Sequence, residues 1–381
     1  MKILHIAPIK FVKKFNIDNE SNSPEGISKS VPSLANAQKK NGNYVGVISS
    51  SKSEVAVSKD IYWNSLKNTY SSIFLFLRVL RDFGKPDLIH IHDIYSLRQI
   101  FFSMFFILIN VKIFISPRGC FSEIALSRSK IKKKLFLIFF KIYALFIHSF
   151  IALNDGEKKQ ISKQFKNKRI IIISNGSDYD AKKNKSLEKK FQEKNNKDFY
   201  TVGYLGRFDV FIKGLDNLLK AYSNYQINTN EIQIKLVFVG EHRSKEVDSV
   251  EFFSSMQTNL PNPEMFIVKD PCYGIEKWRE LASFDLLALP SRSEGMPNVA
   301  LEAMSIGVPC MISPETNMSE IILNSDSGWL VETNEKDIEF FFNNLIKIKK
   351  SELVKKGNNA KNFIKDNLTW DKIAETSYFA K

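Results

Sequence analysis

Short apolar runs alternate with amphipathic stretches through the first half of the chain. The runs are rich in Ile, Val and Phe, which is typical of buried strands, whereas the stretches between them repeat apolar residues at helical spacing. Strands are predicted at Ile3–Ala7, Tyr44–Ile48, Leu88–His92, Lys112–Ser116, Ser149–Leu153 and Arg169–Ser174, with helices such as Ser30–Lys40 and Tyr70–Asp82 between them. This alternation predicts βαβ units, and therefore a parallel sheet with helices on both faces.

A polar segment interrupts this alternation, which then starts again. The segment Asp180–Lys197 is rich in Lys and Asn and nearly free of apolar residues, as expected of a linker or exposed loop. After it we expect strands at Tyr200–Leu205, Ile234–Gly240, Leu286–Pro290 and Pro309–Ser313, helices at Gly214–Tyr225, Val299–Ile306, Glu335–Lys349 and Ser351–Lys365, and a final piece at Trp370–Tyr378.

The pattern therefore predicts two α/β domains. We place them at residues 1–185 and 199–367, with a linker at 186–198 and a C-terminal helix at 368–381. Ligands of open α/β sheets lie at the carboxyl ends of the strands. We therefore expect the site in a cleft between two sheets that face each other.

Composition agrees with a folded protein in a reducing compartment. The chain has 381 residues, enough for two domains, and its 44% hydrophobic and 25% charged residues exclude disorder over the whole chain. Its three cysteines, Cys120, Cys272 and Cys310, are odd in number and far apart, which argues against a disulfide framework or a structural zinc site. The apolar stretch after Met1 is too short for a secretory signal. We therefore expect a cytoplasmic protein.

Positive charge is concentrated in the first half of the chain. Residues 1–200 contain 35 Lys and Arg against 16 Asp and Glu, a net +19, whereas residues 201–381 contain 20 against 25, a net −5. A basic half favours an anionic partner, which leaves a membrane surface, a phosphate-bearing lipid or a nucleic acid as candidates. The alternative is a drift of composition toward Lys, Asn and Ile.

Two apolar segments raise the question of a membrane. Ile100–Ile109 is too short to span a bilayer. Leu135–Leu153 is long enough, but Lys141 and His148 lie within it, and it divides better into a helix followed by a strand. The helix, Ile131–Phe146, is basic and apolar, so it is either a helix lying on a membrane surface or an ordinary core helix with solvated lysines.

The segment Ser291–Glu302 carries the strongest chemical signal. It follows a predicted buried strand, and a helix is expected to start near Pro297, where the N–H groups of the first turn suit a phosphate. Glu294 lies in the loop, and Glu302 lies in the second turn of that helix. A carboxylate can accept two hydrogen bonds from a vicinal diol, so these two could hold the sugars on either side of a pyrophosphate. The alternative is a strand–helix turn with an exposed, capping Glu.

Two cations follow another predicted strand. Arg207 leaves the end of that strand, and Lys213 precedes the next helix. Cations so placed can bracket a diphosphate and stabilise the charge that grows as it departs. The alternative is a pair of solvated surface cations.

These segments resemble those of a known enzyme family. Gly203–Leu219 and Asp285–Pro309 resemble the donor-binding domain of the retaining GT-B glycosyltransferases of glycosyltransferase family four, whose E-x(7)-E motif matches Glu294 and Glu302. The resemblance implies a GT-B fold, with two Rossmann-like, doubly wound domains facing across a cleft. It also implies that the C-terminal helix at 368–381 packs back on the first domain. Similar segments cover nearly the whole chain, namely Pro24–Ser28, Pro86–His92, Ser116–Gly119, Ile173–Gly176 and Trp370–Ala374.

The resemblance also implies roles for individual residues. Glu294 is the candidate catalytic residue and binds hydroxyls of the transferred sugar, Glu302 binds the ribose, and Arg207 with Lys213 binds the diphosphate. The reaction retains the anomeric configuration and needs no cofactor or metal, and no nucleophile is assigned. The other residues expected to bind the donor are Gly26, Gly295, Met296, Pro297, Asn298 and Val299.

Residues on the acceptor side are expected at strand ends of the first domain. His92, Asp93 and Arg118 are the candidates. His90 and His92 alternate along one strand, so they share a face and could in principle ligate a metal, but the spacing shows no third ligand. We expect the two histidines to line the cleft at the strand end.

The resulting hypothesis is a glycosyltransferase that uses a nucleoside-diphosphate sugar, with UDP favoured. Its acceptor would be a saccharide or a lipid-linked saccharide, in the synthesis of capsule, O-antigen or exopolysaccharide. The basic first domain would hold it at the inner face of the cytoplasmic membrane. One alternative is a basic RNA- or membrane-binding protein on a nucleotide-binding scaffold, although no signature of nucleic-acid recognition is present and no nucleic acid is expected. The other is a GT-B sugar-nucleotide epimerase.

Overall fold

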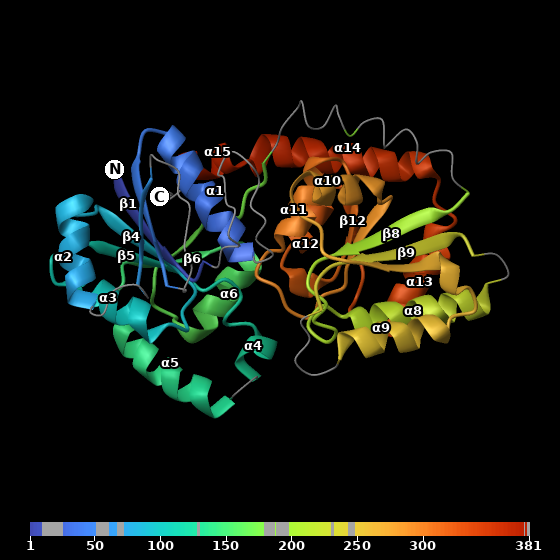
Figure 1. Cartoon of the computed structure of the whole chain (residues 1–381), viewed down its shortest axis with the longest axis horizontal. Helices are drawn as coiled ribbons and strands as arrows, with labels where there is room; N and C mark the ends of the chain where they lie inside the picture. Colours follow the sequence, from blue (N-terminus) through green and yellow to red (C-terminus); the bar gives the residue numbers. More distant parts are fainter. Residues whose placement is uncertain are drawn as a thin grey trace. The chain divides into compact units, whose positions relative to one another are not determined.

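The chain folds into two compact units. The computed structural model describes residues 1–9, 26–50, 61–66, 72–127, 130–178, 187, 198–229, 232–242, 248–376 and 378. Unit 1 comprises Met1–Gly176 and Trp370–Lys381, and unit 2 comprises Ser177–Thr369 (Figure 1). The division falls before the end predicted at residue 185. Most of the predicted linker lies outside the described residues, although Leu187 within it is buried.

Unit 1 contains a seven-stranded sheet in the order β3-β2-β1-β4-β5-β6-β7, in which every neighbouring pair is parallel. All six predicted strands are present. The structure adds an edge strand that the sequence pattern did not show, because its four residues include polar Asn and Ser. The strands are β1 (Lys2–Ala7), β2 (Tyr44–Ser49), β3 (Tyr62–Ser65), β4 (Leu88–His92), β5 (Lys112–Ser116), β6 (Ser149–Ala152) and β7 (Ile170–Ile172).

Helices cover both faces of this sheet. One core contains Leu4 and Ile6 of β1 together with buried residues of α2, α3 and α5, and the other contains Ala7 of β1 and residues of α1. Adjacent residues of a strand point to opposite faces, so the two cores lie on opposite sides of the sheet. The helices are α1 (Gly26–Lys40), α2 (Ser72–Asp82), α3 (Leu97–Ile107), α4 (Glu123–Ser127), α5 (Lys130–Ala144), α6 (Asp155–Gln164) and α15 (Trp370–Thr376).

The end of the chain completes unit 1. Helix α15 packs against α1, and the indole of Trp370 lies so close to Gly176 that a side chain there would collide with it. Trp370, Ile373 and Tyr378 are buried. The C-terminal segment is therefore part of the unit 1 core, although more than half of the sequence separates it from the rest of that unit.

Unit 2 contains a six-stranded sheet in the order β10-β9-β8-β11-β12-β13, again parallel throughout. Its strands are β8 (Tyr200–Leu205), β9 (Ile234–Val239), β10 (Phe266–Lys269), β11 (Leu286–Leu289), β12 (Cys310–Ile312) and β13 (Gly328–Leu330). Its helices are α8 (Leu215–Asn228), α9 (Ser249–Thr258), α10 (Gly274–Ser283), α11 (Asn298–Ser305), α12 (Ser319–Ser325), α13 (Glu335–Leu345) and α14 (Lys350–Asn367). The α/β class and the parallel sheets are confirmed.

Both sheets reverse their winding at one point. In unit 1 the reversal falls between β1 and β4, and in unit 2 between β8 and β11. Loops at the carboxyl ends of two such strands diverge and leave room for a ligand. The residues after β8 and β11, and those after β1 and β4, are therefore where chemistry is expected.

The cysteines and the apolar helices bear on two predictions about the chain as a whole. None of the three cysteines is in a disulfide. Within the described part of the chain, no helix combines the length and the apolar character needed to cross a bilayer.

Candidate functional site

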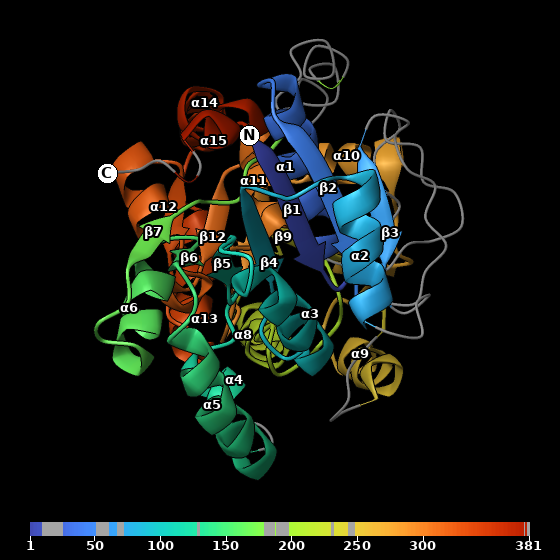
Figure 2. The ribbon, with the colours of Figure 1, turned by 90° about the vertical axis from the view of Figure 1, so that its left-hand side faces the viewer.

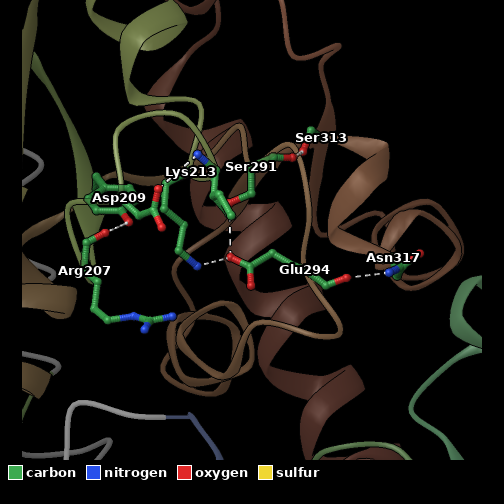
Figure 3. A network of polar contacts seen from close by, with 9 residues as sticks. Arg207, Asp209, Lys213, Ser291, Glu294, Ser313 and Asn317 are labelled. Carbon is green, nitrogen blue, oxygen red and sulfur yellow. Dashed lines mark hydrogen bonds and ion pairs between the residues drawn. The ribbon is translucent and has the colours of Figure 1, made fainter. Parts of the chain in front are cut away.

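The loop after β8 carries the two predicted cations. Arg207 is exposed, two residues beyond the strand, and its carbonyl oxygen accepts a 2.7 Å hydrogen bond from the buried phenol of Tyr204. The backbone N–H of Lys213 donates to the carbonyl of Asp209 at 2.9 Å. These bonds fold the loop into a compact turn, from which the side chains of Arg207 and Lys213 extend in the same direction (Figure 3).

Gly214 allows this turn to reach the neighbouring strand of the switch point. Its φ of 65° is in the left-handed region, and a Cβ there would collide with the carbonyl oxygen of Pro290 directly after β11. This close approach brings Lys213 to Glu294, and the two form an ion pair (Figure 3). The Ser291 hydroxyl also donates to Glu294 Oε1, at 3.2 Å.

The backbone around Glu294 is held as firmly as its side chain. Its N–H donates to the carbonyl of Glu315 at 3.0 Å, and its carbonyl accepts from the amide of Asn317 at 2.6 Å. Asn317 itself has a left-handed φ of 57°. The side chain of Glu294 is only 16% exposed, which contradicts the alternative of an exposed, capping Glu. Neither Glu315 nor Asn317 was predicted from the sequence, because both follow β12 and carry no motif.

Helix α11 begins directly after this loop. Pro297 occupies the N-cap with φ −71°, and the helix starts at Asn298. The N–H groups of a first helical turn have no carbonyl partner within the helix. Met296 and Pro297 are buried and fix the loop, whereas Gly295, Asn298 and Val299 are partly exposed. The predicted anion-binding helix start therefore lies beside Glu294 in the chain, at the switch point.

Glu302 lies on the second turn of α11 but is only 2% exposed. Its carboxylate forms an ion pair with Lys277 of α10. A buried carboxylate requires such a partner, because removing a charge from water is costly. Lys277 was not predicted from the sequence, since α10 itself was not expected. The role of Glu302 in ribose binding stays a prediction.

Unit 1 contains a second polar cluster, built on three histidines. His5 of β1 pairs directly with His90 of β4 in the sheet, and His92 follows two residues later, so all three are on one face and buried. His90 and His92 were expected to line the cleft at the strand end, and the structure places both in the buried interior of unit 1. The third histidine, which the spacing did not show, comes from a strand far away in the sequence, and the three offer ring nitrogens within 4.8 Å of one another.

Hydrogen bonds occupy all six ring nitrogens of this cluster. His5 Nδ1 lies 3.0 Å from His92 Nε2, and His5 Nε2 lies 2.8 Å from Gln38. His90 bonds to the Tyr378 hydroxyl and to Ser116, both at 2.7 Å, and the remaining nitrogen, His92 Nδ1, lies 3.2 Å from Arg118 Nε. With its lone pairs in use and a guanidinium at its edge, the cluster fits a hydrogen-bonded network rather than a metal centre.

Arg118 sets the direction of this network. A guanidinium only donates, so His92 Nδ1 accepts and His92 Nε2 carries a hydrogen, which it donates to His5. His5 then donates from Nε2 to Gln38. All three rings are neutral, because burial lowers the pKa of His5 to about 4 and the pKa values of His90 and His92 well below 6.5.

Arg118 and Asp93 lie in turns at the carboxyl ends of β5 and β4. Both have left-handed φ angles, 54° and 74°. Arg118 Nη1 donates to Ser30 and to Asn175, each at 3.1 Å, and burial lowers the pKa of its guanidinium to about 10. The buried Glu157 accepts from the Gly119 N–H at 2.6 Å, and burial raises the pKa of this carboxyl. Of the predicted acceptor-side residues, His92 and Arg118 thus form one network.

Gly26 was predicted to let a loop approach the phosphates. The structure places it as the first residue of α1, so the helix begins earlier than the predicted Ser30. The residues before it lie outside the described part of the chain. Its predicted role stays a prediction.

Comparison with known proteins now identifies the family. Residues 24–181 match the sequence model described as Glycosyltransferase Family 4, and residues 185–367 match the one described as Glycosyl transferases group 1. The chain belongs to glycosyltransferase family four. The boundary between the two matches lies near the division of the structure into its units.

Individual relatives of this chain are distant. A capsular polysaccharide biosynthesis glycosyltransferase, CapM of Staphylococcus aureus, is 25% identical over 49% of this chain, and the match spans only about half (48%) of that relative's length. A galactosyltransferase of Escherichia coli, named for UDP-Gal and α-D-GlcNAc-diphosphoundecaprenol, is 40% identical over 18% of this chain and 17% of its own length. The crystal structure of Anabaena HepE with UDP and glucose superposes with a TM-score of 0.70 at 17% identity, covering 98% of this chain and 97% of HepE. That likeness confirms the predicted GT-B fold class.

Proposed function

We propose that this glycosyltransferase moves a sugar from a UDP-sugar to a saccharide or lipid-linked saccharide acceptor, with retention of configuration and without a metal. The observation that carries the proposal is the Lys213–Glu294 pair at the switch point of unit 2, next to the start of α11. This arrangement supplies a cation for phosphate oxygens and a fixed carboxylate for sugar hydroxyls within one pair of loops.

The roles of the residues follow from their positions. Arg207 and Lys213 bind the diphosphate, and the first turn of α11 contributes N–H groups to the same anion. As the bond to the sugar breaks, negative charge grows on the departing diphosphate, so cations fixed in advance stabilise the transition state more than the bound donor. Glu294, held by Ser291 and by backbone bonds, positions the sugar by accepting from its hydroxyls.

Several names support the choice of donor and acceptor. HepE binds UDP, and the Escherichia coli relative is named for UDP-Gal and a diphosphoundecaprenol-linked sugar. CapM is named for capsular polysaccharide. We therefore place this enzyme in the synthesis of a cell-surface polysaccharide. A lipid-linked acceptor and a basic first half suit the inner face of the cytoplasmic membrane.

Binding of nucleotides tests the donor site. We expect one nucleoside diphosphate among UDP, GDP and ADP, with UDP favoured, to bind in calorimetry and to raise the melting temperature of the purified chain, with or without Mg²⁺. The Arg207→Ala/Lys213→Ala variant should lose at least about ten-fold in affinity, because charge-assisted hydrogen bonds contribute about 1.5–3 kcal/mol each.

A matched variant controls for charge. Lys269→Ala/Arg279→Ala removes two cations from the same unit. Lys269 lies on β10 and Arg279 on α10, and both side chains are exposed and paired with carboxylates of α10. This variant should bind the nucleotide as the wild-type chain does. If no nucleotide stabilises the folded chain, or if both double variants lose affinity equally, the assigned site is wrong.

A further inference from the structure

Helix α5 is apolar on two opposite faces. Phe140, Tyr143 and Ala144 are buried in the core of unit 1. On the other side, Ile131, Leu135, Ile138 and Ile142 repeat at spacings of four, three and four residues and are 79%, 64%, 58% and 59% exposed. A stripe with this spacing occupies one face of a helix. A surface helix normally presents polar residues there, so the stripe requires an explanation.

The apolar surface continues onto α3 and α2. On α3, Leu97, Phe101, Met104 and Leu108 repeat with the same spacing and are 43% or more exposed, and on α2 the exposed apolar residues are Ile73, Phe74 and Leu77. The helices touch through aromatic pairs. The rings of Phe101 and Phe139 join α3 to α5 at 6.1 Å, and those of Phe76 and Phe106 join α2 to α3 at 4.9 Å. Both views show α3 between α2 and α5 (Figures 1 and 2).

Unit 2 shows no such concentration among its described residues. Its exposed large apolar side chains on helices fall one to a helix, for example Leu323 on α12, Phe340 on α13 and Val354 on α14. Single exposed apolar residues are normal on a protein surface, whereas contiguous ones mark a place of contact. We call the exposed residues of α2, α3 and α5 the apolar face.

Charge identifies the partner of the apolar face. Lys134 and Lys141 are exposed and lie seven residues apart, along one flank of the α5 stripe. Residues 101–150 contain eight Lys or Arg and one acidic residue, Glu123. Two copies of this face would bring like charges together, which disfavours self-association. A bilayer with anionic headgroups matches both properties, because its interface accepts apolar side chains while lysines remain at the headgroups.

We infer that the apolar face docks on an anionic lipid surface, with the α5 stripe inserted into the boundary between headgroups and acyl chains. The inference deepens the proposed function, on which it rests only for the choice of a membrane as the partner. It concerns binding to lipid alone, without nucleotide or acceptor. Lipid binding can therefore be absent while the donor site is correct, and the donor site can be wrong while lipid binding is present.

Vesicle flotation with the full-length chain tests this inference. The wild-type chain should float with vesicles rich in phosphatidylglycerol. Part of it should stay bound at about 0.5 M salt, where attraction between exposed charges is screened within a few ångströms. Leu135→Glu/Ile142→Glu should lower the bound-to-free ratio at least about ten-fold and abolish the salt-resistant part, because each change places a charge in the stripe.

Two further variants separate the contributions. Lys134→Gln/Lys141→Gln should weaken binding at low salt and leave the salt-resistant part. Leu323→Glu/Phe340→Glu makes the same kind of change at exposed positions of unit 2 and should bind as the wild type does. Circular dichroism and nucleotide calorimetry on each variant show whether the fold and the donor site are intact.

Three results would overturn the inference. The first is a folded wild-type chain that binds neither phosphatidylglycerol-rich nor phosphatidylcholine vesicles. The second is equal binding by wild type and Leu135→Glu/Ile142→Glu. The third is a chain that is dimeric in sedimentation equilibrium, ignores vesicles and becomes monomeric in that variant, since the apolar face would then belong to a second copy.

Discussion

Burial keeps the three histidines of unit 1 neutral, and this makes the stability of the chain depend on pH. The pKa of His5 is about 4 in the folded chain, below its ordinary value of 6.5. As the pH falls below 6.5, the unfolded chain takes up a proton that the folded chain does not, so the stabilisation is complete above pH 6.5 and is lost progressively toward pH 4. His5 alone should cost about 2 kcal/mol between pH 7 and pH 5.

Urea unfolding at pH 7 and pH 5, followed by tryptophan fluorescence, measures this loss. The difference in free energy of unfolding between the two pH values should be smaller in His5→Asn than in the wild type, whatever the variant costs overall. His242→Asn replaces an exposed histidine of unit 2, outside the cluster, and should leave the difference nearly unchanged. An undiminished pH dependence in His5→Asn would show that His5 is not the group being protonated.

Single residues were predictable where the chain places them at a strand end within a motif. Arg207, Lys213 and Glu294 became candidates in this way, and the structure brings Lys213 and Glu294 into contact. Lys277 and His5 could not be found, since each meets its partner from another element without a motif. The register of β1 against β4 puts His5 beside His90, and the register between two parallel strands cannot be predicted from the sequence of either strand alone.

The turn between β8 and α8 brings Lys213 to Glu294 in the loop after β11, and Gly214 is the residue that permits this close approach. With φ at 65° and the Pro290 carbonyl where a Cβ would lie, Gly214→Ala introduces both backbone strain and a collision. The strain costs about 1–2 kcal/mol, and the collision should add about 1–3 kcal/mol. The turn should shift away from β11 and take Lys213 with it, so nucleotide affinity should fall as well.

A second glycine separates these two effects. Gly307 also has a left-handed φ, 87°, but a Cβ added there would have its nearest neighbouring atom 3.5 Å away, which is ordinary contact. Gly307→Ala should therefore show the strain alone and leave nucleotide binding unchanged. Urea unfolding and calorimetry on both variants make the comparison. Equal costs in the two, with affinity preserved in Gly214→Ala, would mean that the turn has no part in holding the site.

Elements were predictable in proportion to their burial. Strands buried on both faces, such as β4 and β8, contain no Lys, Arg, Asp or Glu and were predicted to the residue. The edge strands β3, β10 and β13 were missed, because each is short and only partly buried. The segment Ile100–Ile109 raised the question of a membrane because it is almost wholly apolar. Most of it forms α3, which has one face in the core and exposed apolar residues on the other.

The two units share one topology, and this topology concentrates the polar residues. Each sheet reverses its winding next to its first strand, and the polar clusters lie at or near those reversals, Lys213 with Glu294 in unit 2 and His92 with Arg118 in unit 1. Alternating strands and helices predicted parallel sheets, and general rules for such sheets then predicted the carboxyl ends as the site. The packing of the last helix on the first domain was expected from the family resemblance alone, and the structure places Trp370–Lys381 in unit 1.

The packing of the last helix, α15, leads to a prediction about the stability of unit 1. Trp370 and Tyr378 are buried in unit 1, the Tyr378 hydroxyl bonds to His90, and α15 packs on α1. Deleting residues 370–381 should therefore weaken unit 1, which holds the first strand of the chain, and spare unit 2. Losing the burial of two large side chains costs about 3–6 kcal/mol, so amide hydrogens of α1 and β4 should exchange at least about 100-fold faster. Those of β8 and β11 should not change.

Tyr378→Phe, which keeps the ring and loses only its hydroxyl, should show a smaller effect in the same peptides. Faster exchange throughout both units would instead mean that the segment supports the molecule as one cooperative body, and unchanged exchange in α1 would mean that its contact with α15 contributes little.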